Sequence, residues 1–219
     1  MLHTSFSWAG VSQSRSTFKF LTNLLFGRRP TLSARTNADN ADVSFEVASG
    51  DNKQLFCAHG QILAARCPTL ASLAKGCDPN TPIAIEDVPA DVFRMLLRFI
   101  YGGEVPSKEV IIEQAKTIIR AADRFECTGL KLAVEAELAT AGITTENAAG
   151  LFLFADATNC ALLKEATMEY FVTNAQDVMA TEGFAQVKES PAVLTELMTA
   201  MAVSIQTVSY THLTLPTKA

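Results

Sequence analysis

The sequence predicts an α+β domain followed by an all-helical one. Residues 43–47 alternate apolar and polar side chains, as a strand with one buried face does, and turn-forming residues at 50–52 predict a hairpin with a second strand around Phe56. From residue 106 onward, apolar residues instead recur every three or four positions, which is the spacing of an amphipathic helix. Strands are therefore expected only in the first half, and helices alone in the second.

Two short helices and one more strand are expected after the hairpin. Residues 62–65 predict a helix that ends before Pro68, because a residue that precedes proline is biased away from helical geometry. Residues 70–74 predict the second helix. After a loop rich in proline and aspartate, residues 83–85 carry apolar side chains at alternate positions and predict the third strand.

A longer helix is expected to begin at Pro89, since the missing N–H of a proline costs nothing in the first helical turn. The pair Gly102-Gly103 should end it. Beyond this point, residues 111–122 and 130–138 each form an apolar stripe at helical spacing, and Gly142 should interrupt the chain before a further set of helices.

Caps predict where the later helices begin. Thr144 or Thr145 is expected to cap one helix and Asn159 the next, because their side-chain oxygens can accept a bond from a free helical N–H. Ser190 followed by Pro191 predicts the start of the last helix. From Ser204 onward the helical period is lost, and the final residues resemble translated vector sequence, so residues 204–219 are expected to be a disordered or non-native tail.

The domain boundaries follow from these patterns. Residues 1–40 are an extension rich in Ser, Thr, Arg and Asn that contains one short amphipathic helix, although an Arg-bearing, acid-free segment also fits an organelle transit peptide. Residues 41–125 form the α+β domain and residues 126–203 the helical region.

Composition excludes several classes of protein. The 219 residues are 48% hydrophobic, which is enough to bury a core, and no apolar run approaches the length of a membrane span, so a soluble chain is expected. The net charge is −5, but the first 38 residues carry five basic side chains and no acid. The rest has 13 Lys and Arg against 23 Asp and Glu, a net charge of −10, which disfavours nucleic-acid binding.

Cysteine and histidine usage points away from metal and thiol chemistry. The five cysteines are an odd number, spread along the chain without an export signal, so reduced thiols are expected. His59 has no second histidine nearby, which favours a hydrogen-bonded core role over a catalytic or metal-binding one. With no phosphate loop or nucleophile motif either, the sequence predicts neither an enzyme nor a cofactor.

Particular residues carry a family resemblance. The strand beginning Asp42-Val43, the Ala58-His59 pair, the run Leu63-Ala-Ala-Arg-Cys-Pro68 and the pattern from Asp87 to Gly103 together resemble a BTB/POZ domain. The segments around Ala121-Ala122-Asp123-Arg124-Phe125 and Glu146–Ala157 resemble the BTB-to-BACK junction of the speckle-type POZ protein and plant MATH–BTB proteins. The resemblance covers about residues 18 to 203 and includes no MATH domain.

This resemblance implies a homodimeric, non-catalytic adaptor that docks a cullin-3 ubiquitin ligase scaffold and presents an unknown protein substrate, in the cytoplasm and/or nucleus. In relatives, the helix before the first strand packs across a two-fold axis, which assigns the dimer interface to apolar residues that could alternatively belong to the core within one chain. These residues are Leu21, Leu24, Leu25 and Ile62.

Two departures from the family pattern bear on partners. Cullin-binding relatives carry an apolar-x-Glu triplet where this chain has Leu73, Ala74 and Lys75, so a lysine replaces the expected carboxylate. Repressor-type relatives carry a basic residue where this chain has Gly60. The cullin-binding candidates are Leu73, Lys75 and Tyr101, although Tyr101 could equally be a packing residue. The alternative function is a BTB scaffold that self-associates without binding cullin.

Overall fold

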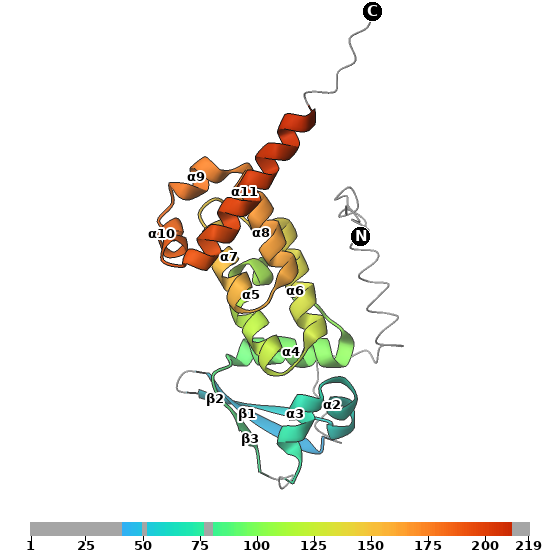
Figure 1. Ribbon diagram of the computed structural model, residues 1–219. Coiled ribbons are helices and arrows are strands. Elements are labelled where there is room, and N and C mark those ends of the chain that lie inside the picture. Colours follow the sequence, from blue (N-terminus) through green and yellow to red (C-terminus); the bar gives the residue numbers. More distant parts are fainter. Residues whose placement is uncertain (1–40, 50–51, 77–80, 212–219) are drawn as a thin grey trace, which may run out of the picture. The chain divides into compact units, whose positions relative to one another are not determined.

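A computed structural model describes residues 41–49, 52–76 and 81–211 (Figure 1). The proposed dimer residues Leu21, Leu24 and Leu25 and the last eight residues of the chain lie outside this part. The described chain forms two compact units. Unit 1 combines the chain up to Val105 with residues 121–130, and unit 2 combines residues 106–120 with the chain from Lys131 onward.

The sheet of unit 1 has three strands in the order β2-β1-β3. β1 (Val43–Ser49) pairs antiparallel with β2 (Asn52–Ala58), with Phe45 opposite Phe56, and parallel with β3 (Ile83–Ile85). The alternation of β1 places Phe45 and Val47 on the buried face, whereas Glu46 on the other face forms an ion pair with Lys53 of β2 at 2.7 Å. The predicted hairpin and third strand are therefore confirmed.

Helices cover the buried face of this sheet. α2 (Gly60–Arg66) and α3 (Pro68–Ala74) are separated by Cys67, as expected from the proline. α4 (Ala90–Gly102) follows Pro89 and ends at Gly103, whose φ of 66° is the left-handed conformation that glycine adopts without strain. The N–H of Gly103 donates to the Phe99 carbonyl at 2.8 Å, which closes the last turn of α4.

The core of unit 1 is centred on Phe93 of α4. Its ring lies edge-on to those of Phe45, Phe56 and Phe125, with centroid distances of 5.6, 5.3 and 6.1 Å. Such edge-to-face contacts add to the free energy of burial of each ring. The Phe93 side chain is fully buried. Phe125 belongs to the segment 121–130, which unit 1 takes from later in the chain, so this segment completes the core of unit 1.

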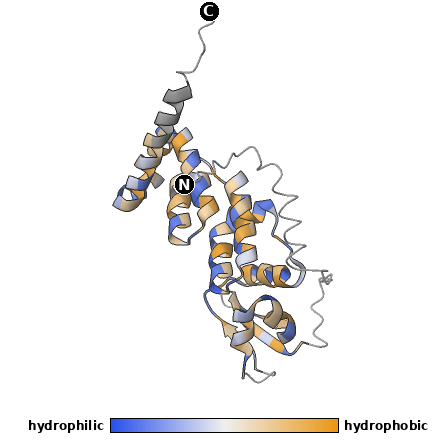
Figure 2. Ribbon diagram, turned by 45° about the vertical axis from the view of Figure 1, so that its right-hand side comes forward, coloured by the Kyte–Doolittle hydropathy of each residue, from blue (hydrophilic) through white to orange (hydrophobic). Residues whose placement is uncertain are grey.

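The remaining helices follow Pro106, and Figure 2 shows both hydrophobic and hydrophilic residues along them. They are α5 (Lys108–Arg124), α6 (Thr128–Ala141), α7 (Ala148–Ala157), α8 (Ala161–Thr173), α9 (Ala175–Met179), α10 (Gly183–Lys188) and α11 (Pro191–Thr211). Within the described residues, no helix is both long and apolar enough to cross a bilayer.

The core of unit 2 lies among α7, α8, α10 and α11. Phe171 and Phe184 stack at 5.6 Å, and Phe152 and Leu197 are almost fully buried beside them. Lys164 of α8 joins three helices on the surface of this unit, because its Nζ lies 2.7 Å from Asp156 of α7 and 2.8 Å from Glu196 of α11.

The predicted caps of α7 and α8 are wrong in detail. Asn147, not a threonine, organises the start of α7, since its Oδ1 accepts from the Thr144 N–H and its Nδ2 donates to the Gly142 carbonyl. Asn159 adopts a left-handed conformation two residues before the start of α8, and the Leu163 N–H is instead satisfied by Glu135 of α6 at 3.0 Å. At α8, a side chain distant in the sequence replaced the local cap, and a local pattern does not reveal such a partner.

The expected loss of helix from Ser204 is also wrong over residues 204–211. α11 continues to Thr211, because no glycine or proline occurs between Pro191 and that residue and each added turn extends an established helix at low cost. The short helices α9 and α10 had no predicted counterpart.

Candidate functional site

The first part of the candidate site is the junction between the sheet and α2. Asp42 Oδ1 accepts the N–H of Gly60 at 2.6 Å and so satisfies a free donor at the start of α2. A Cβ on Gly60 would lie 3.2 Å from Asp42 Oδ2, closer than most such contacts. Because Gly60 has no side chain, the Asp42 carboxylate can approach the start of α2. The Asp42 carboxylate is thus occupied by a hydrogen bond within its own chain.

Tyr101 binds the residue next to this junction. The His59 N–H donates to the Tyr101 hydroxyl at 2.8 Å, and His59 Nδ1 lies 3.0 Å from the same oxygen, so the hydroxyl can accept from the backbone and donate to the ring. Tyr101 is only 6% exposed, and burial raises the pKa of its phenol. Tyr101 therefore packs within unit 1, and its side chain adds almost no area to the surface that a partner could contact.

Two groups of the α5–α6 turn, the Phe125 carbonyl and the Glu126 carboxylate, hold α3 in place. Cys67 Sγ donates to the Phe125 carbonyl at 3.3 Å, and Thr69 Oγ1 donates to Glu126 Oε2 at 2.8 Å. Cys67 is buried, and burial raises the pKa of its thiol. These contacts anchor the first turn of α3 to residues that are distant in sequence. The orientation of α3 therefore depends on the packing of residues 125 and 126 against it.

The cullin-binding candidates Leu73 and Lys75 lie at the other end of α3. Leu73 is 42% exposed, and Lys75 is exposed at the position that ends the helix. Ile62, the one proposed dimer residue in the described chain, lies partly buried on α2. Leu73 and Lys75 lie together at the end of α3, whereas Tyr101 lies on α4 and is buried. The partner contacts of all three, and of Ile62, stay predictions.

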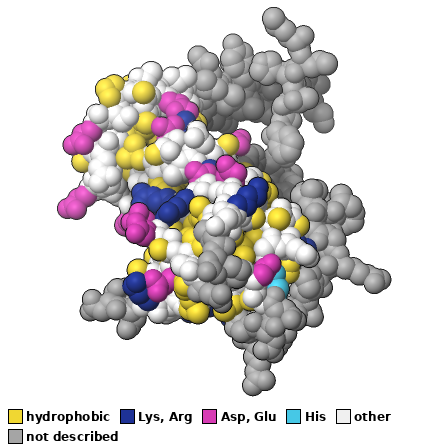
Figure 3. Space-filling view, turned by 90° about the horizontal axis from the view of Figure 1, so that it is seen from below, with side chains coloured by type: hydrophobic (Ala, Val, Ile, Leu, Met, Phe, Trp, Pro, Cys, Tyr) yellow, Lys and Arg dark blue, Asp and Glu magenta, His cyan; other side chains and the backbone are white. Residues whose placement is uncertain are grey.

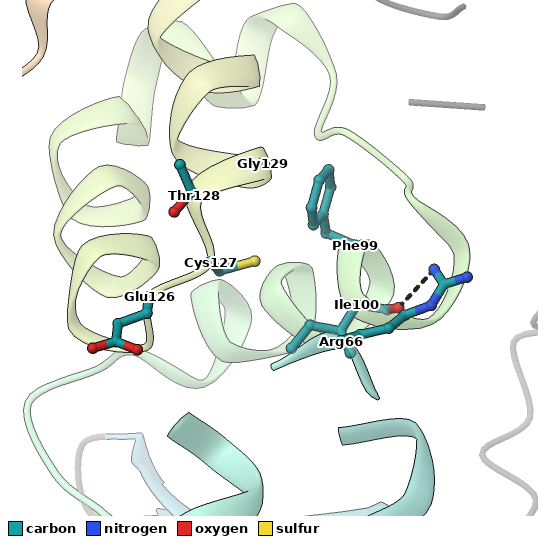
Figure 4. A pocket seen from close by; sticks show the side chains of 7 residues that line it. All are labelled: Arg66, Phe99, Ile100, Glu126, Cys127, Thr128 and Gly129. Carbon is teal, nitrogen blue, oxygen red and sulfur yellow. Dashed lines mark hydrogen bonds between the residues drawn. The ribbon is translucent and has the colours of Figure 1, made fainter. Parts of the chain in front are cut away.

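Unit 1 also contains a small pocket that the sequence did not predict. It has a volume of about 180 Å³ and lies where the end of α2, the end of α4 and the start of α6 meet (Figure 4). The Arg66 guanidinium donates to the Ile100 carbonyl at 3.2 Å on one side, and Glu126, with a φ of 55°, lies on the other. The lining residues are Arg66, Phe99, Ile100, Glu126, Cys127, Thr128 and Gly129.

This pocket is a small gap in the packing, and the Cys127 thiol that lines it is neutral. Burial raises the pKa of Cys127 to about 11, so the thiolate that nucleophilic chemistry requires is scarce at neutral pH. Among the described residues, no group of three His, Cys, Asp or Glu side chains could hold a metal ion. None of the four described cysteines is in a disulfide.

We expect Cys127 to make the protein less stable at alkaline pH. The folded thiol has a pKa of about 11 against an ordinary value of 9.0, so between these values the unfolded state loses a proton that the folded state retains. Stability from this group is complete below pH 9.0 and decreases as the pH rises toward 11. Urea titrations from pH 8 to 11 should therefore show a shallower decline for Cys127→Ala than for the parent protein. A Cys57→Ala control, at a partly exposed cysteine, should follow the parent; identical slopes for all three proteins would contradict the assignment.

The described side chains on the face shown in Figure 3 have no dominant charge. On the face shown in Figure 3, hydrophobic side chains lie between separate groups of basic and acidic ones. Mixed apolar and charged surfaces of this kind suit protein partners better than a polyanion, which needs many cations on one face.

Comparison with known proteins agrees with this geometry. A model of the BTB/POZ domain family matches residues 32–141, half of the chain, and a model of the BPM/SPOP BACK domain matches residues 147–198. The two matches follow each other in the order of the α+β and helical regions.

Two individual proteins are similar to this chain. The BTB/POZ and MATH domain-containing protein 4 of Arabidopsis thaliana is 28% identical over 188 residues, which cover 76% of this chain; the chain spans 38% of that protein's length. The structure of the BTB domain of human gigaxonin matches with a TM-score of 0.35 and 17% identity, over 61% of this chain and 96% of that one. With a sheet-and-helix unit, a helical unit and both family matches, this chain belongs to the BTB/POZ family and is a protein-interaction module with a BACK domain of the BPM/SPOP type.

Proposed function

We propose that this protein is a homodimeric substrate adaptor of a cullin-3 RING ubiquitin ligase. The observation that carries the proposal is the succession of a BTB/POZ match and a BPM/SPOP BACK match along one chain. In this function the protein has no catalytic role. It would bind the ligase scaffold and an unidentified protein substrate in the cytoplasm and/or nucleus.

The exposed end of α3 supports a docking role. Leu73 offers an apolar side chain to a partner while the first turn of the same helix is anchored by Cys67 and Thr69. A helix that is fixed at one end and exposes an apolar residue at the other loses little conformational freedom on binding. Lys75 beside it carries the charge opposite to the glutamate of cullin-binding relatives, which should weaken docking.

We therefore expect Lys75→Glu to bind the N-terminal domain of cullin-3 more tightly than the parent protein. The introduced carboxylate can accept hydrogen bonds that an ammonium cannot, so the gain should be about 1 to 3 kcal/mol. Isothermal titration calorimetry of both proteins measures it. Lys188→Glu, with the same charge change in unit 2, is the control and should leave the affinity unchanged.

Other outcomes of this titration have definite meanings. Equal and tight affinities for the parent and Lys75→Glu would show that Lys75 is not at the interface. No binding by either protein would reject the adaptor function. It would favour the alternative, a BTB scaffold that self-associates without cullin, for which the lysine at position 75 is the specific supporting observation.

Self-association is the second part of the proposal. We expect the parent protein to be a dimer and the double variant Leu21→Asp/Leu25→Asp to be a monomer, because two carboxylates would otherwise be buried without partners. Multi-angle light scattering after size exclusion measures the mass. Leu55→Asp is the control, because Leu55 is 60% exposed on β2 and outside the proposed interface. A dimer mass for the double variant would contradict the assigned interface.

A further inference from the structure

Two cations of α5 lie over a single aromatic ring of α7 within unit 2. Lys116 Nζ is 5.7 Å from the centre of the Phe154 ring, and Arg120 Cζ is 5.6 Å from it. The two side chains are four residues apart, so they occupy the same face of α5. Both are exposed, whereas Phe154 is only 6% exposed. We call Lys116, Arg120, Phe154 and the adjoining Gly150 the Phe154 platform.

The positive charge of the Phe154 platform is not neutralised within the described chain. Neither Lys116 nor Arg120 forms an ion pair with a carboxylate of the described residues, although Glu113 lies three residues before Lys116 on α5. Lys164 provides a contrast, since it lies 5.7 Å from the Phe152 ring and pairs with two carboxylates. Like charges at this helical spacing repel each other, so the platform slightly destabilises α5.

The surface next to these cations is open. A Cβ built on Gly150 of α7 would meet only Lys116 Nζ, at 3.9 Å. Glycine inside a helix is unfavourable by roughly 0.5 to 1 kcal/mol relative to alanine, so this position also has a cost in stability. Together, the missing side chain at Gly150 and two cations without a carboxylate partner among the described residues leave room for an incoming side chain to reach Lys116.

We propose that the Phe154 platform is a docking site for an acidic peptide segment of a partner protein. Carboxylates of such a segment would pair with the Arg120 guanidinium, which can bind one in a bidentate manner, and with the Lys116 ammonium. Charge complementarity identifies the occupant: two neighbouring cations match the carboxylates of a short acidic segment, whereas a nucleic acid needs many more cations on one face. The inference concerns unit 2 and is independent of cullin binding at α3.

The test uses the full chain and a fluorescein-labelled peptide of six glutamates, with binding followed by fluorescence anisotropy at low and at physiological salt. The double variant Lys116→Gln/Arg120→Gln should bind about tenfold more weakly, as expected for the loss of two exposed charge pairs. The control Lys53→Gln/Lys188→Gln removes the same net charge elsewhere and should bind as the parent does. Circular dichroism melts establish that both variants are folded.

A further variant separates the site from the overall charge. Gly150→Glu keeps both cations but places a carboxylate beside Lys116, so it should compete with the peptide and weaken binding. The proposal is overturned if the parent does not bind the peptide, or if the platform and control variants bind equally. A single-stranded oligonucleotide of equal charge is the second probe, and platform-dependent binding of it that is tighter than that of the peptide would overturn the peptide assignment.

Discussion

Phe93→Ala should lower the free energy of unfolding of unit 1 by about 3 to 5 kcal/mol, the range for removing a phenyl ring from a packed core. The Phe93 side chain is fully buried and contacts three other rings, from β1, β2 and the residue that follows α5. Its removal leaves a cavity that the surrounding strands and helices cannot close without losing these contacts. Urea titration followed by circular dichroism, with amide hydrogen exchange of β1 and α4, measures the loss and locates it.

The matched control is Arg94→Ala, the next residue on the exposed face of α4. Arg94 donates to the Gln54 side chain at 2.7 Å and lies over the Phe56 ring, but it is exposed. Its removal should cost less than about 1 kcal/mol. If Phe93→Ala destabilised the protein no more than this control, the aromatic cluster would not be the centre of the core.

Glu135→Ala should have the next largest effect, a loss of about 2 to 4 kcal/mol in unit 2, from a hydrogen bond to a charged group together with a small cavity. Glu135 is 2% exposed and accepts the Leu163 N–H at the start of α8. There a carboxylate also interacts favourably with the partial positive charge of the helix N-terminus. Thermal unfolding of the variant, with hydrogen exchange at the first turn of α8, is the measurement.

Glu135→Gln distinguishes the hydrogen bond from the charge. Its side-chain oxygen can still accept the Leu163 N–H, so it should recover much of the loss caused by alanine. Equal stability of the parent, Glu135→Ala and Glu135→Gln would show that solvent satisfies this N–H. A nearby contact also holds the α7–α8 turn, because Lys131 of α6 donates to the Thr158 carbonyl at 2.7 Å.

The sequence was informative where local chemistry determines structure. Alternation placed Phe45 and Val47 on one face of β1, and proline and glycine marked the ends of α2 and α4. It failed at the start of α8, where the N–H donor is satisfied by Glu135, 28 residues earlier in the chain. No cap pattern encodes such a partner, because the contact exists only after the helices pack.

The same distinction applies to the candidate site. The exposed positions of Leu73 and Lys75 follow from the family pattern, but the burial of Tyr101 depends on its contact with His59, which is 42 residues away. The pocket beside Arg66 combines three separate segments and has no sequence signature. Lys116 and Arg120 are recognisable as a like-charged pair on one helix face, but only the fold places the Phe154 ring beneath both.

The division of the chain between the two units also constrains the order of events during synthesis. Unit 1 takes residues 121–130 from beyond a stretch that belongs to unit 2, and Phe125 in that segment packs on Phe93. A nascent polypeptide that has left the ribosome only as far as Val105 therefore lacks one side of its aromatic core. In the same way, α3 acquires its contacts with Phe125 and Glu126 only when translation has passed residue 126.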